Sequence, residues 1–203
     1  MIINDLNIVL VGGFNPHIIE PAWLMKEGVV DEKREKFSLD WQFETMTGAG
    51  FRSRFVLDGL QWEVGLERLK LASKGDPSPA PWIERLLEKL PHTPVRAVGH
   101  NFQFQCPRSE WSGFVPSLPE EESLPDILGK AAFNRFITRS NLPDGTQITL
   151  TLTFSEKIVV IGANFHRGVK GIEMALEHIR NLEDDRNNMT EVVETISKQC
   201  IKR

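Results

Sequence analysis

Short segments in which apolar and polar residues alternate are the feature of this sequence that most restricts its fold. Residues 38–44 (SLDWQFE) and 146–154 (TQITLTLTF) both follow this pattern. A period of two is typical of a β-strand with one buried face. Residues 51–57 and 60–66 are also strand-like, and Asp58-Gly59 between them favours a two-residue type I′ hairpin. The sequence therefore predicts strands that are joined by tight turns and pair antiparallel.

The apolar positions change parity after this hairpin. They are even-numbered up to Leu66 and odd-numbered at Leu69 and Leu71. A one-residue shift of this kind is typical of a β-bulge, and glycine is the residue least strained there. We therefore expect a bulge near Gly65.

Three segments carry apolar residues at helical spacing. Residues 82–90 follow a proline-rich stretch that suits a helix start. Residues 126–137 (DILGKAAFNRFI) and 172–182 have similar apolar stripes, and the polar run 183–188 is expected to bend or interrupt the last helix. With residues 1–11 as a first strand, this order predicts an α+β fold, with a largely antiparallel sheet and helices on one face.

The chain divides at a polar, proline-rich segment, residues 106–125, which is expected to be a linker or a long surface loop. This gives an N-terminal β/α half (residues 1–105) and a C-terminal α-β-β-α half (residues 126–203), two similar halves packed as one compact unit. Trp111 and Phe114 lie in the linker. Aromatic residues in a loop either anchor a binding partner or, more commonly, pack back onto their own domain.

A Gly-x-Asn-Phe motif occurs in both halves, in residues 98–104 (VGHNFQF) and 161–167 (IGANFHR). On a strand, each copy has one bulky apolar face and one face of glycine and polar residues. His100 belongs to the apolar face, where a buried, hydrogen-bonded histidine is the simplest interpretation. The shared pattern is best explained by equivalent strands in two related halves.

The polar faces of the two copies supply the candidate binding residues. If the strands are neighbours, Asn101, Gln103, Asn164 and His166 form a polar strip across the sheet. The glycine of each copy lies beside the strip and would allow a ligand or another backbone to approach closely. No nucleophile or carboxylate pair accompanies the strip at a catalytic spacing.

Composition limits the classes of partner. The chain has 203 residues, 40% hydrophobic and 26% charged, with a net charge of −4, so no basic excess indicates nucleic-acid binding. The apolar runs are far shorter than the ~20 residues that cross a bilayer, and the N-terminus lacks the features of a signal peptide. Cys106 and Cys200 are far apart and match no metal spacing, so we expect no metal, no cofactor, and a cytoplasmic protein with free thiols.

The order of elements from about residue 38 to residue 200 suggests a family. The strand-like segment P94-V-R-A-V-G-H-N-F102 follows a helix, and a β-hairpin closing on I161-G-A-N-F-H166 precedes a long amphipathic helix. In these features the chain resembles a sporadically distributed, uncharacterised bacterial α+β family. The typical Arg-Tyr pair after the glycine is replaced here by His100-Asn101-Phe102. The resemblance implies the patchy occurrence of mobile or defence-associated genes, and it supplies no catalytic residues.

Three functions remain open. The first is a non-catalytic protein-binding subunit or adaptor of a larger bacterial complex, in antiphage defence or a toxin–antitoxin pair, and compatible with homo-oligomers. It is favoured because motifs such as G-x-S-x-G and H-E-x-x-H are absent from the sequence. The second is a hydrolase or nuclease that uses His166 and Asn164, with Glu63 or His100. The third is a small-ligand site between the halves, with Gly99 and Gly162 admitting the ligand.

Overall fold

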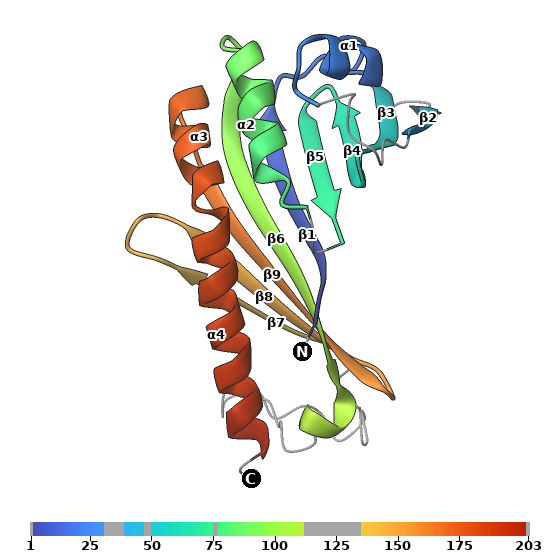
Figure 1. Ribbon diagram of the computed structural model, residues 1–203. Coiled ribbons are helices and arrows are strands. Elements are labelled where there is room, and N and C mark those ends of the chain that lie inside the picture. The colour runs from blue at the N-terminus through green and yellow to red at the C-terminus, as the bar shows by residue number, and fades with distance from the viewer. Residues whose placement is uncertain (1, 31–38, 47–49, 75–76, 112–134, 202–203) are drawn as a thin grey trace.

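The computed structural model describes residues 2–30, 39–46, 50–74, 77–111 and 135–201. Long strands dominate this part of the chain, and helices lie between groups of strands (Figure 1). The strands are β1 (Ile2–Gly12), β2 (Leu39–Met46), β3 (Gly50–Leu57), β4 (Leu60–Gly65), β5 (Arg68–Ser73), β6 (Val95–Pro107), β7 (Arg135–Asn141), β8 (Gln147–Phe154) and β9 (Ile158–Gly168). The helices are α1 (Pro21–Lys26), α2 (Ala80–Lys89), the 3-10 turn η1 (Arg108–Trp111), α3 (Ile172–Arg180) and α4 (Leu182–Ile201).

The described strands form one antiparallel sheet in the order β2-β3-β4-β5-β1-β6-β9-β8-β7. The fold is therefore α+β, as the alternating segments predicted. The central strand β1 and its neighbour β6 are not consecutive in the chain. β6 and β9, which carry the two Gly-x-Asn-Phe copies, are direct neighbours.

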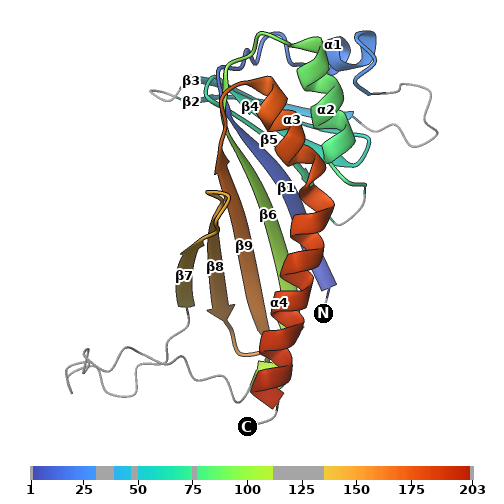
Figure 2. The ribbon, with the colours of Figure 1, turned by 90° about the vertical axis from the view of Figure 1, so that its left-hand side faces the viewer.

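The core lies between the sheet and its helices. Helices α2, α3 and α4 lie against the same side of the sheet in Figures 1 and 2. Apolar side chains from α2 (Trp82, Ile83) and from α3 and α4 (Ile179, Leu182, Val193) are almost completely buried there. Burial of this apolar surface is the main contribution to folding. No helix in the described segments is long and apolar enough to span a membrane.

Several local predictions are confirmed. Asp58 and Gly59 both have positive φ, 53° and 75°, as a type I′ turn between β3 and β4 requires. The last helical region is interrupted at Asn181, just before the polar run 183–188. Along β6, Val98, His100, Phe102 and Phe104 are buried, as expected for its apolar face.

The bulge expected near Gly65 is wrong. β4 ends at Gly65 and β5 begins at Arg68, with Val64 paired to Leu69, so the chain reverses direction there. A tight turn and a bulge both change the parity of the apolar positions, and the sequence alone did not distinguish them.

The helix predicted over residues 126–137 is wrong at residues 135–137. Residues 126–134 lie outside the described residues, but Arg135, Phe136 and Ile137 belong to strand β7, which pairs with β8. The predicted linker also begins later than expected. Cys106 and Pro107 complete β6, residues 108–111 form η1, and the rest of the linker is outside the described residues.

Candidate functional site

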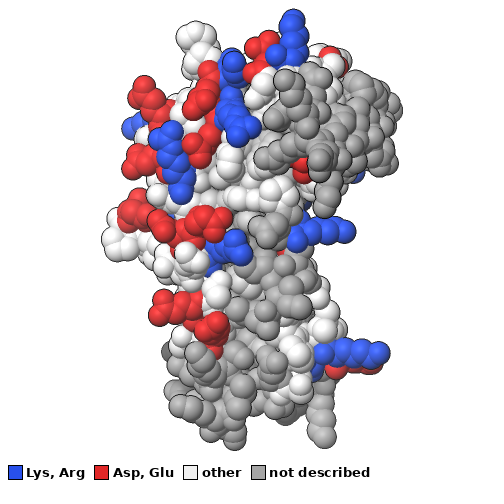
Figure 3. All heavy atoms as spheres, in the orientation of Figure 1, with Lys and Arg blue, Asp and Glu red and all other residues white. Residues whose placement is uncertain are grey.

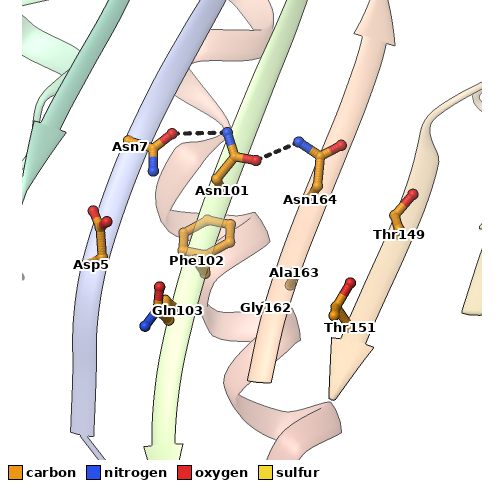
Figure 4. Close-up of a pocket in the computed structure, with 10 residues that line it drawn as sticks. All are labelled: Asp5, Asn7, Asn101, Phe102, Gln103, Thr149, Thr151, Gly162, Ala163 and Asn164. Atoms are coloured by element: carbon orange, nitrogen blue, oxygen red, sulfur yellow. Dashed lines mark hydrogen bonds between the residues drawn. The ribbon is translucent and has the colours of Figure 1, made fainter. Parts of the chain in front are cut away.

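The sheet face opposite α2, α3 and α4 carries a row of asparagines across three strands. Asn7 on β1 is paired with Asn101 on β6, which is paired with Asn164 on β9. Asn101 Nδ2 donates to Asn7 Oδ1 at 2.9 Å, and Asn164 Nδ2 donates to Asn101 Oδ1 (Figure 4). Each amide thus fixes the orientation of its neighbour. Within this row of described residues, the two hydrogen bonds leave Asn164 Oδ1 as a further acceptor and Asn7 Nδ2 as a further donor.

A shallow hollow of about 240 Å³ lies beside this row. Its side chains offer amide, hydroxyl and carboxylate groups but no Lys or Arg, and its lining residues come from β1, β6, β9 and β8 (Figure 4). The lining residues are Asp5, Asn7, Asn101, Phe102, Gln103, Thr149, Thr151, Gly162, Ala163 and Asn164. The hollow can therefore both donate and accept hydrogen bonds.

Gly162 explains why the hollow exists. It is paired with Gln103 on one side and with Thr151 on the other. A Cβ atom added at Gly162 would meet Thr151 Cβ and Thr151 O at 3.9 Å, an ordinary van der Waals contact. A larger side chain would therefore fit the backbone and occupy the hollow.

The predicted strip is thus assembled in part. Asn101, Gln103 and Asn164 line one hollow, whereas His166 is exposed and paired with Gly99, outside the lining. Sequence reasoning missed Asp5, Asn7, Thr149 and Thr151, although the threonines stand on the polar side of an alternating strand that was predicted.

The two loop aromatics provide no exposed anchor in the described part of the chain. Trp111 is 0% exposed and belongs to the core, so its side chain packs back onto its own domain. It is therefore not available to a partner on the surface. Phe114 lies outside the described residues.

The side chains proposed for hydrolysis do not converge. Glu63 forms ion pairs with Arg52 (3.3 Å) and Arg54 (3.4 Å) on β3, and three strands separate its strand from that of His166. His100 faces the helices, on the other side of the sheet from His166. A general base must lie within hydrogen-bond reach of its partners. The geometry of the described residues gives the hydrolase hypothesis no support.

A buried polar network lies on the helix side. Asp185 of α4 accepts from His100 Nδ1 at 2.7 Å and from both terminal nitrogens of Arg167 at 2.6 and 2.7 Å. Arg167 Nε also donates to Thr146 Oγ1 at 3.0 Å. His100, Arg167 and Asp185 are 0%, 6% and 4% exposed. The bidentate pair and the histidine hydrogen bond together attach α4 to β6 and β9.

The charge states in this network follow from burial and hydrogen bonding. Burial lowers the pKa of His100 more than its hydrogen bond to Asp185 raises it. Burial raises the pKa of Asp185, but the hydrogen bonds from His100 and Arg167 outweigh burial and leave that pKa below its ordinary value. At neutral pH the network therefore holds a neutral His100, an ionised Asp185 and a charged Arg167. Its one negative and one positive charge balance, which suits a structural role.

The prediction of a buried, hydrogen-bonded His100 is confirmed, but its partners were missed. A signal was present in the sequence. Arg167 continues the odd-numbered apolar face of residues 159–165, and Asp185 lies three residues after Leu182 and four before Met189, at core spacing on its helix. Charged residues at two core-facing positions indicate a buried pair.

Within the described part of the chain, no group of three or more potential metal ligands converges. No protein-family model matches the sequence, and no curated protein is significantly similar to it.

Proposed function

We propose that this protein is a non-catalytic binding subunit, and that it binds a protein partner through the sheet face that carries the asparagine row. The observation that carries the proposal is the hollow over Gly162, where a preorganised set of hydrogen-bonding groups surrounds an absent side chain. The proposal requires the helices to be confined to the other face. A bacterial, defence-associated setting, as the family resemblance implies, a cytoplasmic location, as the free thiols favour, and a toxin–antitoxin pair as the alternative setting are parts of the same proposal.

The symmetry of the strand order supports a related proposal, that the fold consists of two similar halves. β1 pairs with β5, the last strand before α2, and β6 pairs with β9, the last strand before α3. Two units of this kind meet at the β1–β6 pair, beside the hollow. In two-unit folds, binding sites are common where the units meet.

The chemistry of the hollow defines the partner group that it fits. Asp5 disfavours an anionic group, whereas Gln103 and the threonine hydroxyls serve both donors and acceptors. A carboxamide side chain on the partner, from Asn or Gln, carries no charge and can both donate hydrogen bonds to these groups and accept them. A carboxamide that replaces the hydrogen bonds of water around these polar groups loses little on displacing that water.

The first experiment identifies the partner by position. A photo-crosslinking amino acid is placed at Thr149, inside the hollow, and in a matched chain at Thr153, on the same strand face but outside the lining. Both chains are expressed in the native host. The proposal expects one protein to crosslink from Thr149 and not from Thr153. A chain that purifies as a solitary monomer and crosslinks to nothing specific from Thr149 contradicts it.

The second experiment measures affinity with the purified partner. Gly162→Gln fills the hollow, whereas Gly168→Gln adds the same side chain on the same strand face, at a site where nothing lies within 4 Å of an added Cβ. We expect Gly162→Gln to weaken binding at least about tenfold, or about 1.4 kcal/mol, and Gly168→Gln to change it less than about twofold. Equal affinities for the two variants would show that the partner does not use the hollow.

A small ligand is the second candidate, and the convergence of several polar groups on the hollow favours it. A neutral molecule with amide or hydroxyl groups would raise the midpoint of thermal unfolding by mass action. A panel of amides and polyols tests this by thermal shift, with Gly162→Gln as the variant that must lose the effect. If the variant responds like the original chain, the ligand binds elsewhere.

A further inference from the structure

Strand β7 ends the sheet, and its outer edge has no neighbouring strand in the described part of the chain (Figure 2). Its residues are exposed except Phe136, which is half-buried. An open strand edge offers backbone N–H and C=O groups that can pair with another extended segment. Proteins commonly use such edges to bind peptides by strand addition.

An apolar groove of about 390 Å³ runs beside this edge, on the helix side of the sheet. Its floor is formed by strands β7, β8 and β9, and its wall is formed by α4. The lining residues are Thr138, Ser140, Leu142, Ile148, Leu150, Phe165, Asn188, Met189 and Val192. Thr138 and Ser140 are short, so the groove is accessible from the β7 edge.

The other face of β7 is basic. Arg135 and Arg139 alternate with Thr138 and Ser140, so they point to the face opposite the groove. Both arginines are exposed, and no ion pair links either of them to another described residue. The helix-bearing side is different, because acidic and basic residues alternate there over α2 and α3 (Figure 3), with Arg180 and Glu84 3.3 Å apart.

We propose that the β7 edge binds an extended acidic–apolar segment of a partner protein by antiparallel strand addition. Successive β7 side chains point to opposite faces of the sheet, and this alternation determines which positions of the partner segment are apolar and which are acidic. Read from its N-terminus, the segment has an apolar residue opposite Ser140, an acidic residue opposite Arg139 and an apolar residue opposite Thr138. Two unrestricted residues follow, and then an acidic residue opposite Arg135. The apolar side chains enter the groove, and the acidic ones face the arginines.

Charge excludes a second copy of this chain as the preferred occupant. In an antiparallel self-pair centred on Ile137, each Arg135 faces Arg139 of the other copy. Centring the pair on Thr138 still gathers four arginines on adjacent positions of one face. Like charges directly opposite on neighbouring strands destabilise the pairing. The acidic segment replaces this repulsion by attraction. The groove lies on the opposite face of the sheet from the hollow, and the two arginines lie on the same face as the hollow but at the β7 edge, outside its lining. The proposal does not require the hollow to be occupied.

A synthetic peptide of the predicted pattern, TLEVTTET, tests the proposal against the full chain. Fluorescence anisotropy of the labelled peptide gives its affinity at low salt. The scrambled peptide TEELTVTT has the same composition, but its two glutamates fall on opposite faces. We expect TLEVTTET to bind at least tenfold more tightly than TEELTVTT, and N-methylation of its edge-facing amides to abolish binding. Equal binding of the two peptides, or no binding of either, overturns the proposal.

Charge reversal provides the second test. Arg135→Glu/Arg139→Glu should weaken binding of TLEVTTET at least tenfold and should bind the reversed peptide TLKVTTKT instead. Ser140→Trp should fill the groove and weaken binding, whereas Asn141→Trp, on the other face of the same strand, should not. Unfolding midpoints establish that each variant folds. If the charge-reversed chain still prefers TLEVTTET, or if sedimentation shows a dimer that the peptide does not displace, the proposed occupant is wrong.

Discussion

The buried pair of Asp185 and Arg167 permits a quantitative prediction. Asp185→Asn keeps the size of the side chain and removes its charge. Arg167 is 6% exposed and makes two of the three hydrogen bonds to the carboxylate, so its guanidinium would remain buried without a counter-charge. Removing one partner of a buried ion pair costs about 3–5 kcal/mol. This is a large part of the roughly 5–15 kcal/mol by which domains are stable.

A double replacement separates the charge effect from the loss of packing. In Arg167→Met/Asp185→Leu neither charge remains, and the apolar side chains occupy similar volume. His100 still loses its acceptor, which costs about 1–3 kcal/mol. We therefore expect the double variant to be more stable than Asp185→Asn, although it carries more changes.

Urea unfolding followed by circular dichroism measures the free energies of unfolding. For a chain of this size, each kcal/mol lost from the free energy of unfolding lowers the midpoint of thermal unfolding by about 2–4 °C. Asp185→Asn should therefore lower that midpoint by about 6–20 °C. Asp184→Asn is the matched control, because Asp184 is the adjacent residue of α4 and is exposed. A cost below about 1 kcal/mol for Asp185→Asn, or a double variant less stable than the single one, would refute a buried pair that attaches α4 to the sheet.

Two further outcomes are expected. Burial lowers the pKa of His100 from 6.5, so its contribution to the free energy of unfolding should be fully present above about pH 6.5 and should be lost as the pH drops towards the lowered pKa. Urea titrations should show a flatter dependence of this free energy on pH for His100→Gln in this range. An unchanged dependence would contradict the neutral charge state assigned to His100. Trp111→Ala should cost about 3–5 kcal/mol because the side chain is completely buried, whereas Leu66→Ala, at a side chain 54% exposed, should cost less than about 0.5 kcal/mol.

Much of the sheet was predictable because strand alternation is a local property. The hairpin at Asp58-Gly59 and the faces of β6 and β9 follow from the period of two and from turn chemistry alone. The polar sides of β6 and β9 were therefore also predictable. The pairing of β1 with β6 was not, because it joins strands about 90 residues apart through contacts that no local pattern records.

The wrong helix over residues 126–137 has a physical explanation in β7. An edge strand needs only partial burial, and Phe136 is the one half-buried residue between exposed neighbours. Its alternation is consequently weak, with Ile137 exposed on the same face as Arg135 and Arg139. Apolar residues at 127, 128, 131 and 136 fit helical spacing equally well. Local pattern reasoning is least informative at sheet edges, where the structure also offers its second candidate surface.

The two Gly-x-Asn-Phe copies have a joint explanation that neither copy has alone. Their antiparallel pairing sets Asn101 opposite Asn164, Gly99 opposite His166 and Gly162 opposite Gln103. Each glycine therefore faces a longer polar side chain of the other copy. At Gly99 the strand on the other side contributes Val9, whereas at Gly162 it contributes Thr151. A Cβ added at Gly99 would meet Asn164 Nδ2 at 3.6 Å, whereas one added at Gly162 would meet only Thr151, at 3.9 Å. The amide of Asn164 therefore lies over Gly99, while the space over Gly162 stays open and forms part of the hollow, and His166, opposite Gly99, lies outside the lining.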